Sequence, residues 1–472
     1  MKAFLRILSL FLVLGGATLL APAQQQSSWT LRQQGVEHQP VTFNRDVVRI
    51  LQNRCQGCHH VGDIAPFPLV TYQDTYKHRQ AIRYNTENRI MPPWHAGPSC
   101  AEFQDNPSLT TEEIQTLSTW VATGAPEGNP ADMPPALQFS SGWPLGEPDL
   151  VFTMPQPVTP DFSNGDVYRC FVFPTNLDQD LFLGAVDIAP GSRKMVHHVL
   201  LFVDQTTKSE ELDAGGEPGP GYTCFGGPGF NVVYNLGGWA PGNQAKLLPD
   251  GIGLFLPKKS RIVMQVHYSA RSGVTEPDRT SIGLYRSRKP VQKQLLTLPV
   301  INQSFKIPPG ESNYKVTANF PFVPFGGHLL GITPHMHLLG KKMKVTARIN
   351  GKEVCLIDVP DWDFHHQRTY LYKEQIALPF GSRVDLTAYY DNSAANPNQP
   401  NQPPKEVGWG ENTTDEMCIA FLHFTLDGEN LTGSFGQAAT TIHSFPRFWE
   451  VDLLPVPRQP GPIKGLGRPH RH

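Results

Sequence analysis

Residues 261–268 read Arg-Ile-Val-Met-Gln-Val-His-Tyr, an eight-residue run with the apolar content and spacing of a β-strand. Alternation along such a strand places Gln265 and His267 on one face. Similar short runs, separated by frequent glycines and prolines, recur through the roughly 320 residues after residue 130. This region is long enough for two domains, and its pattern predicts a mainly β architecture.

The composition supports this prediction and excludes several classes of protein. Glycine and proline, 42 and 45 of 472 residues, make up about 18% of the chain, where about 12% is usual. Lysine plus arginine (40) nearly balance aspartate plus glutamate (42), which excludes an electrostatic nucleic-acid binder and a polybasic membrane-surface protein. Hydrophobic residues at 39% are enough for real cores, so wholesale disorder is excluded as well.

The two ends of the chain have the composition of segments outside the folded protein. Lys2 and Arg6 precede an apolar stretch, residues 7–20, and Ala-Pro-Ala at 21–23 has the small-residue pattern of a cleavage site. We therefore predict a signal peptide over residues 1–23, the alternative being a membrane anchor. The mature protein is expected to be periplasmic or secreted in a bacterium, with no membrane span. A disordered tail rich in proline, glycine and basic residues is predicted over 453–472.

The first candidate site is Cys55-Gln56-Gly57-Cys58-His59, which matches the covalent attachment motif of c-type haem. The two thiols would bind the haem vinyl groups and His59 would be the proximal ligand. Zinc would need a second pair of ligands at suitable spacing, and a thioredoxin-like site would need a βαβ context. Neither is visible in the sequence. An all-α haem domain is therefore predicted over residues 24–130, ending in a Pro-rich linker.

Met91 is the predicted sixth ligand of the haem iron, because the prolines of Met91-Pro92-Pro93 stiffen the backbone around it. The alternatives are His60, His78 or His95 as the ligand, or an open position. Asn44 is expected to cap the helix before the haem motif. A capping box, Thr110 to Glu113, predicts a last helix of this domain.

Histidines recur in the β region at spacings typical of metal ligands. His335 and His337 stand two residues apart, on one side of a predicted strand, where they form a natural chelate. His197 and His198 are adjacent, so both reach one ion only where the strand is distorted. A thioether at Met417 together with imidazoles favours copper, whereas zinc would more often have a carboxylate or thiolate. His328, and His365-His366 after Asp361-Trp362-Asp363-Phe364, are interpreted as structural or pocket-lining.

From about residue 167 to 424 the chain resembles the copper type II, ascorbate-dependent monooxygenases, the family of peptidylglycine α-hydroxylating and dopamine β-monooxygenases. Residues 40–130 resemble a bacterial cytochrome c domain of the kind fused to such oxygenases. The motifs that carry the resemblance to the monooxygenases are VYRC (167–170), VHHVLLF (196–202), QVHY (265–268), IPPG (307–310), PHMHLLG (334–340) and TDEMC (414–418).

The resemblance implies two antiparallel, jelly-roll-like β-sandwich domains with one copper each, over residues 131–287 and 288–452. His197, His198 and His267 would bind the electron-transfer copper. His335, His337 and Met417 would bind the catalytic copper. The resemblance also implies a Cys170–Cys224 disulfide and leaves Cys100, Cys355 and Cys418 without an assigned partner.

Three departures bear on the substrate. The peptide-processing branch has an arginine two residues before its His-x-His motif and an asparagine and a tyrosine two and four residues after its methionine. Here these positions are Thr333, Ile419 and Phe421. A buried substrate carboxylate without its arginine is costly, so we expect a pocket that does not favour peptides ending in glycine.

The expected function is hydroxylation of a C–H bond in a small organic substrate with dioxygen. The cofactors would be two copper ions and one haem c. Electrons from an external reductant, ascorbate or a substitute such as a periplasmic donor, would pass from the haem to the first copper and then to the second. The alternative is a non-catalytic copper-binding or electron-transfer protein on the same fold.

Overall fold

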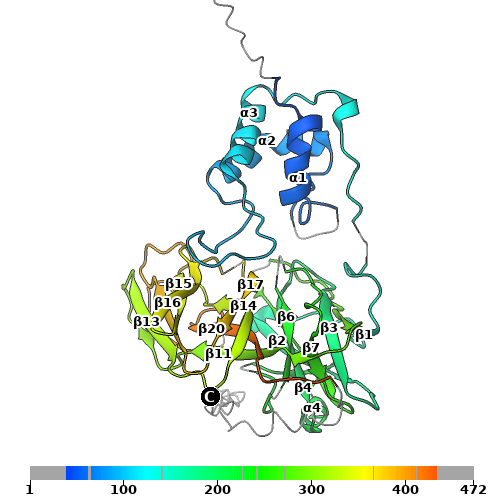
Figure 1. The fold of residues 1–472 in the computed structure, drawn as a ribbon, viewed down its shortest axis with the longest axis vertical. Coiled ribbons are helices and arrows are strands. Elements are labelled where there is room, and N and C mark those ends of the chain that lie inside the picture. Colours follow the sequence, from blue (N-terminus) through cyan, green and yellow to red (C-terminus); the bar gives the residue numbers. More distant parts are fainter. Residues whose placement is uncertain are drawn as a thin grey trace, which may run out of the picture. The chain divides into compact units, whose positions relative to one another are not determined.

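The computed structural model describes residues 39–432, except 62–64, 140–141, 216, 226, 233, 241–242, 271–272, 365 and 411. The predicted signal peptide and the predicted C-terminal tail lie outside the described residues. Strands and antiparallel sheets dominate the described chain, which confirms the mainly β prediction (Figure 1). Within the described residues no helix is long and apolar enough to cross a membrane.

Residues 43–132 contain the larger helices and have a hydrophobic core of their own, built around Phe43, Leu51, Leu117 and Trp120. Both long helices begin with a capping box, at Thr71 with Asp74 and at Thr110 with Glu113. The elements are a π-helical turn (Phe43–Val47), α1 (Val48–Arg54), α2 (Tyr72–Glu87), α3 (Thr111–Ala122) and a 3-10 turn (Pro130–Asp132).

Asn44 does not cap the first helix, so that prediction is wrong. It lies inside the opening turn, where its side chain is buried and its amide donates to the Gly128 carbonyl at 3.4 Å. Thr42 precedes the turn, without a side-chain cap. The predicted box at Thr110 and Glu113 is confirmed, and α3 buries Leu117, Trp120 and Val121.

The first β-sandwich pairs two five-stranded sheets around one core, with strand orders β5-β2-β8-β4-β6 and β1-β9-β3-β7-β10. Every ladder in them is antiparallel except the short pairing of β7 with β10. The strands are β1 (Leu150–Thr153), β2 (Val167–Pro174), β3 (Leu181–Ala189), β4 (Val196–Asp204), β5 (Tyr222–Thr223), β6 (Tyr234–Trp239), β7 (Ile252–Leu256), β8 (Arg261–Tyr268), β9 (Ser281–Arg286) and β10 (Lys293–Gln294). A short 3-10 turn (Phe162–Asn164) precedes β2, and α4 (Lys208–Asp213) follows β4.

The run that opens the sequence analysis, residues 261–268, is strand β8. It lies between β2 and β4, and every side chain after Arg261 is buried. This central position explains why its sequence is almost continuously apolar. The functional consequence is that the end of β8 delivers His267 into the interior.

The second β-sandwich pairs two four-stranded sheets, with strand orders β11-β20-β14-β17 and β13-β18-β15-β16, around a second core. The strands are β11 (Leu296–Ile301), β13 (Tyr314–Phe320), β14 (Gly327–His335), β15 (Gly340–Ile349), β16 (Lys352–Val359), β17 (Tyr370–Leu378), β18 (Arg383–Tyr390) and β20 (Ile419–Leu426). A separate two-stranded ladder joins β12 (Lys306–Ile307) to β19 (Val407–Gly408). All of these ladders are antiparallel.

The segment between α2 and α3 packs on the second β-sandwich. Ala96 and Phe103 belong to its buried core. Phe103 forms a bridge with Tyr372 of β17, and the Gly97 amide donates to the Asp358 carbonyl of β16 at 2.7 Å. The segment therefore contributes structure to the sandwich while it connects two helices.

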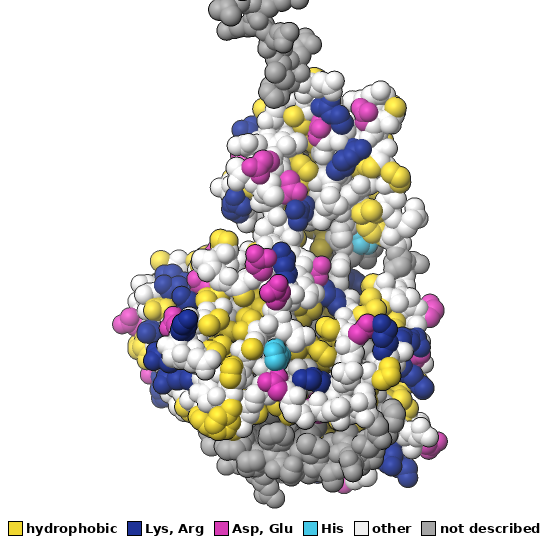
Figure 2. Space-filling model, viewed as in Figure 1, with side chains coloured by type: hydrophobic (Ala, Val, Ile, Leu, Met, Phe, Trp, Pro, Cys, Tyr) yellow, Lys and Arg dark blue, Asp and Glu magenta, His cyan; other side chains and the backbone are white. Residues whose placement is uncertain are grey.

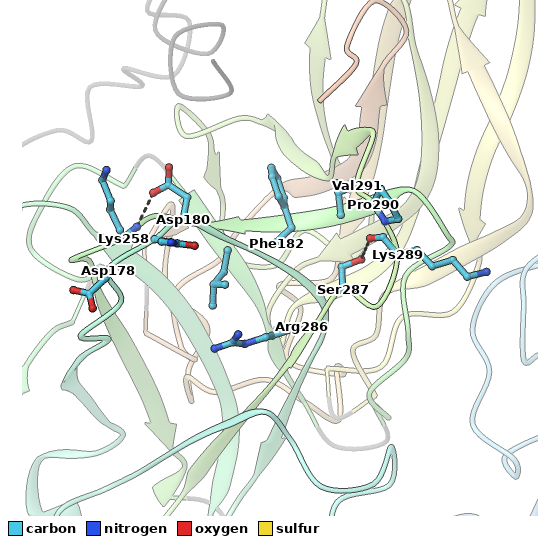
Figure 3. Close-up of a pocket in the computed structure, with 11 residues that line it drawn as sticks. Asp178, Asp180, Phe182, Lys258, Arg286, Ser287, Lys289, Pro290 and Val291 are labelled. Carbon is cyan, nitrogen blue, oxygen red and sulfur yellow. Dashed lines mark hydrogen bonds between the residues drawn. The ribbon is translucent and has the colours of Figure 1, made fainter. Parts of the chain in front are cut away.

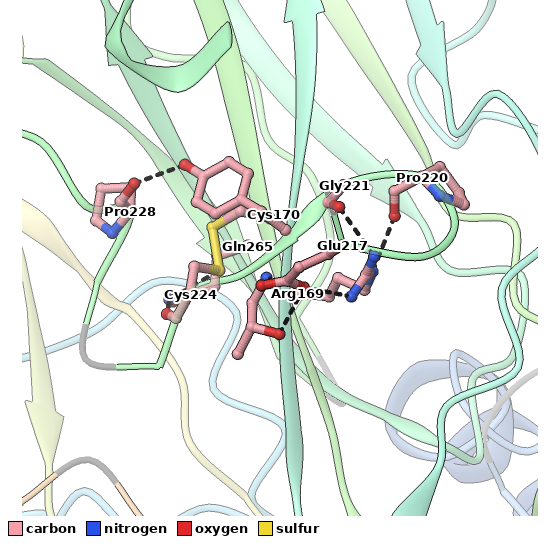
Figure 4. Close-up of a disulfide and its surroundings, with 10 residues drawn as sticks. Arg169, Cys170, Glu217, Pro220, Gly221, Cys224, Pro228 and Gln265 are labelled. Atoms are coloured by element: carbon pink, nitrogen blue, oxygen red, sulfur yellow. Dashed lines mark hydrogen bonds and ion pairs between the residues drawn. A yellow bond between two sulfur atoms is a disulfide. The ribbon is translucent and has the colours of Figure 1, made fainter. Parts of the chain in front are cut away.

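Each sandwich also contains one disulfide. Cys170–Cys224 joins β2 to the residue after β5, which confirms the implied pairing. Figure 4 shows this bond beside Arg169, which donates to the Gly221 carbonyl, and beside Gln265, whose amide donates to the Cys224 carbonyl at 2.8 Å. The other bond, Cys100–Cys355, fastens the segment after α2 to β16.

The visible face of the molecule carries charged side chains of both signs, interspersed with apolar ones (Figure 2). This distribution agrees with the nearly balanced charge of the chain.

Candidate metal centres

The first histidine cluster consists of His197 and His198 from β4 and His267 from the neighbouring strand β8. The register between the two strands shifts between Val196 and His198. This bulge provides the strand distortion that two adjacent histidines need to point to the same place.

The three imidazoles meet through their Nδ1 atoms, which form a nearly equilateral triangle. The Nδ1–Nδ1 distances are 3.3 Å for His197–His198, 3.2 Å for His197–His267 and 3.3 Å for His198–His267. The centre of such a triangle lies about 1.9 Å from each nitrogen, close to the about 2.0 Å of a metal–imidazole bond. The geometry can therefore hold one metal ion without rearrangement.

Asp166, just before β2, determines which nitrogen of His267 is available. His267 Nε2 donates to Asp166 Oδ2 at 3.1 Å, so its Nδ1 has the unshared electron pair. Burial opposes the charge on Asp166, but hydrogen bonds from His267 and Thr413 hold the pKa of this carboxyl well below its usual range. The ring of Tyr168 stacks on His267 with a centroid distance of 4.1 Å.

Burial lowers the pKa of two rings of the first cluster, His198 and His267. The pKa of His267 is lowered by burial and raised in part by Asp166. The pKa of His198 is lowered by burial and by neighbouring histidines, which include His335 and His337 of the second cluster. These lowered pKa values favour the neutral imidazole, the form in which histidine binds a metal.

The second cluster consists of His335 and His337 at the end of β14. Met417, its predicted third member, stands just before β20, and its backbone N–H donates to the Glu416 carboxyl. His335 Nδ1 bonds to Gln367 Oε1 at 2.6 Å, and His337 Nδ1 donates to the Asp415 carbonyl at 3.1 Å. With both Nδ1 atoms engaged, each ring presents Nε2, and the two ring planes are nearly perpendicular at 86°. Met417 is 6% exposed.

Glu416 is a buried hydrogen-bond acceptor for the backbone next to the second cluster. Its carboxylate accepts the backbone N–H groups of His337 at 2.9 Å and Leu339 at 2.6 Å. It is fully buried, and burial raises its pKa to about 8, partly offset by these hydrogen bonds. Because Glu416 directly precedes Met417, one side chain ties the His-x-His segment to the methionine.

Phe364 stands between the two clusters. Its ring stacks on His197 of the first cluster at 4.7 Å and meets His337 of the second cluster edge-on at 5.9 Å. One aromatic ring therefore contacts a histidine of each cluster.

The residues of the predicted haem motif follow α1. The backbone N–H groups of Cys58 and His59 both donate to the Cys55 carbonyl, which forms a tight turn. His59 Nδ1 donates to the Phe67 carbonyl at 3.0 Å, so Nε2 is the ring nitrogen that points away from Phe67 and has the unshared electron pair. Burial and the neighbouring Cys58 raise the pKa of Cys55 to about 12. Met91 follows α2 and is 36% exposed.

The three departures from the peptide-processing pattern lie beside the second cluster. Thr333 pairs with Phe421 across β14 and β20, and His335 pairs with Ile419. The Thr333 hydroxyl bonds to Thr369 and to His423 Nε2, both at 2.8 Å. A chain of neutral polar groups therefore occupies the position of the family's arginine.

A cavity of about 520 Å³ lies elsewhere, on the first sandwich near Phe182 and Arg286 (Figure 3). Its lining includes none of the predicted site residues. Its size alone does not connect it with the chemistry of the histidines.

Sequence reasoning missed the residues that orient the histidines: Asp166, Phe364, Gln367 and Glu416. Glu416 stands in the quoted motif TDEMC and Asp166 directly precedes VYRC, so proximity to the motifs was the only available signal. Phe364 and Gln367 lie in the loop between β16 and β17, and no pattern in the sequence indicates that this loop reaches both clusters.

Comparison with known proteins agrees with this geometry. Residues 294–440 match the family described as copper type II ascorbate-dependent monooxygenase, C-terminal domain. The human DBH-like monooxygenase protein 1 is 24% identical over 264 residues, which cover 50% of this chain and 40% of the human protein. The mouse protein of the same name is 23% identical over 290 residues, covering 55% of this chain and 44% of the relative.

The aligned region therefore spans less than half the length of these relatives. Among solved structures, the major capsid protein P2 of bacteriophage PM2 aligns with 59% of this chain and 97% of its own, at 9% identity and a TM-score of 0.22, which is too low to carry an argument. The family match over residues 294–440 and the two relatives confirm the resemblance, recognised from the motifs, to the copper type II ascorbate-dependent monooxygenases.

Proposed function

We propose that this protein is an exported copper monooxygenase that hydroxylates a small organic substrate. The observation that carries the proposal is the pair of histidine clusters that both contact Phe364, one of which presents three nitrogens at 3.2–3.3 Å separations. The two disulfides are typical of an oxidising compartment and support export.

The two clusters fit copper in different ways. His197, His198 and His267 would hold one ion through three Nδ1 atoms, a closed arrangement suited to electron transfer. His335 and His337 would hold the other through Nε2 atoms, with the Met417 thioether as a soft third ligand that favours Cu(I). Two fixed imidazoles and one thioether leave room for dioxygen.

Cys55, Cys58 and His59 fit a covalently attached haem, because both cysteines are outside the two disulfides and His59 Nε2 is the free ring nitrogen. Met91 stays the proposed sixth ligand. When bound, haem and the two coppers would supply one-electron chemistry and the activation of dioxygen. The protein's own side chains orient the ligands, and their burial lowers the pKa of the histidines.

The substrate we propose lacks a carboxylate near its reacting carbon. Thr333, Thr369 and His423 present neutral hydrogen-bonding groups there, and Ile419 and Phe421 are apolar. A carboxylate desolvated beside these groups would have no cationic partner. Efficient turnover of a glycine-extended peptide would refute this part of the proposal.

Metal analysis and the variant Met417→Ile test the function. We expect two coppers and one haem per chain, and substrate-dependent oxygen consumption that falls by about 100-fold or more in the variant, beyond the about 10–100-fold typical of losing an outer-sphere partner. The haem spectrum and copper at the first cluster should be retained. Unchanged oxygen consumption would remove Met417 from the site. Copper binding without substrate oxidation across a panel of small organic molecules would favour the alternative, a non-catalytic electron-transfer protein.

A further inference from the structure

A third group of potential metal ligands consists of residues outside both clusters. His95, in the segment between α2 and α3, faces Asp363 and His366 of the loop between β16 and β17, and one ligand atom from each lies within 4.8 Å of the others. In the sequence, His95 lies more than 260 positions before Asp363 and His366. They come together because the neighbours of His95, Trp94 and Ala96, pack against the core of the second sandwich.

The ring of His95 is oriented as a metal-bound histidine would be. Its Nε2 atom is buried and has no hydrogen-bond partner. The backbone of Asp361 is a hydrogen-bond partner of the ring, whose Nε2 atom is left without one. Ligating histidines usually donate their second N–H to a backbone carbonyl or carboxylate, which fixes the tautomer and directs the other nitrogen at the metal.

Electrostatics also favour a neutral ring that can bind a cation. Burial lowers the pKa of His95, and the nearby Asp363 only partly offsets this shift. A buried imidazole nitrogen without a partner is costly in an otherwise satisfied interior. A bound cation would satisfy it.

Asp363 and His366 are the other two potential ligands, and both are partly exposed to solvent. His366 Nδ1 bonds to Asp363 Oδ2 at 2.7 Å, and the two side chains are 35% and 33% exposed, so an ion can enter from solvent. Two imidazoles and one carboxylate form a zinc-type ligand set with a fourth position for water. We propose that His95, Asp363 and His366 bind one divalent transition-metal ion of the zinc class.

A metal ion at this site would connect two segments that are far apart in the sequence. The loop that contributes Asp363 and His366 also contributes Phe364, which separates the histidine clusters, and Gln367, which orients His335. On the other side, His95 lies four residues after Met91. A metal here would fasten the chain leaving the haem-binding region to the loop that supports the copper clusters, beside the Cys100–Cys355 disulfide.

Zinc binding by the copper-loaded, full-length protein tests the proposal. Zn²⁺ is titrated calorimetrically, and bound zinc and copper are counted after dialysis. Wild type should bind one Zn²⁺ without releasing copper, and His95→Gln, Asp363→Asn and His366→Gln should each weaken this binding about tenfold or more. The matched control is His328→Gln, which breaks a His–Asp pair of similar geometry at 2.6 Å and should leave zinc binding unchanged.

Equal zinc binding by wild type and the three variants, or none by wild type, would overturn the proposal. If His95→Gln fails to form the Cys100–Cys355 bond, Asp363→Asn and His366→Gln, at partly exposed positions, decide the question. A changed haem spectrum in His95→Gln with zinc binding intact would instead assign His95 to the haem iron and contradict the metal site.

Discussion

The two histidine clusters use the same side chain in opposite ways. In the first, His267 donates through Nε2 to a carboxylate and three Nδ1 atoms converge. In the second, His335 and His337 engage their Nδ1 atoms with the neutral oxygens of Gln367 and Asp415 and present Nε2. The hydrogen-bond partner of each ring, rather than the histidine itself, determines the ligand atom and the number of nitrogens that meet.

The clusters also differ in what supports them. The first is built into a bulged, central strand pair of the first sandwich. The second depends on loop segments held together by the buried carboxylate of Glu416. Stability should therefore be more sensitive to single polar substitutions at the second cluster, and copper affinity more sensitive to the carboxylate at the first.

Glu416→Ala should have the largest effect on stability. It would leave the His337 and Leu339 N–H groups buried without an acceptor, which we expect to cost about 3–5 kcal/mol of unfolding free energy. Glu429→Ala is the control, because Glu429 accepts one backbone N–H, from Gln294, and should cost about 1 kcal/mol. Urea denaturation measures both. Equal losses would mean that Glu416 has no special role.

The two disulfides, one in each sandwich, differ in the length of chain that they close. Cys100–Cys355 closes a separation of 255 residues and Cys170–Cys224 one of 54. If loop-closure entropy dominates, Cys100→Ser/Cys355→Ser should cost about 1 kcal/mol more than Cys170→Ser/Cys224→Ser, within losses of about 2–5 kcal/mol. Thermal unfolding of the two double variants tests the order. The reverse order would show that local packing outweighs chain length.

Acid should weaken the second sandwich through His423, whose Nε2 bonds to the Thr333 hydroxyl beside the second cluster. Burial lowers the pKa of His423 to about 4. Between pH 6.5 and 4, His423 is protonated in the unfolded chain but not in the folded protein. The free energy of unfolding therefore falls as pH falls, by up to about 3 kcal/mol. In His423→Gln this pH dependence should shrink, as measured by urea midpoints from pH 4 to 7. An unchanged slope would exclude His423 as its source.

Substitution of Asp166 or Gln367, which bond to the clustered histidines, should have the smallest effect and should change the copper affinity of one cluster only. Asp166→Asn should weaken copper binding at the first cluster about 10–100-fold and leave the second unchanged, whereas Gln367→Ala should act only on the second. Competition with a copper chelator measures both affinities. If each variant weakened both clusters equally, the separate roles of the two partners would be contradicted.

The grouping of the histidines could be predicted from the sequence better than the groups that orient them. Local patterns were sufficient for the capping box at Thr110 and for the strand distortion at His197 and His198. They were insufficient for Cys100–Cys355, because nothing local indicates that a segment between two helices packs on a distant sheet. The Asn44 prediction failed for a related reason: Phe43 begins the turn one residue earlier, and the fold buries Asn44 inside it.

We expect the two clusters of the chain to bind copper independently of each other. Anaerobic titration with Cu(I) tests it most directly, in wild type, His267→Ala and His335→Ala. We predict two tightly bound equivalents in wild type and one in each variant, with the remaining site retaining its affinity. Fewer than two tightly bound equivalents in wild type, or loss of both sites in either folded variant, would contradict the account.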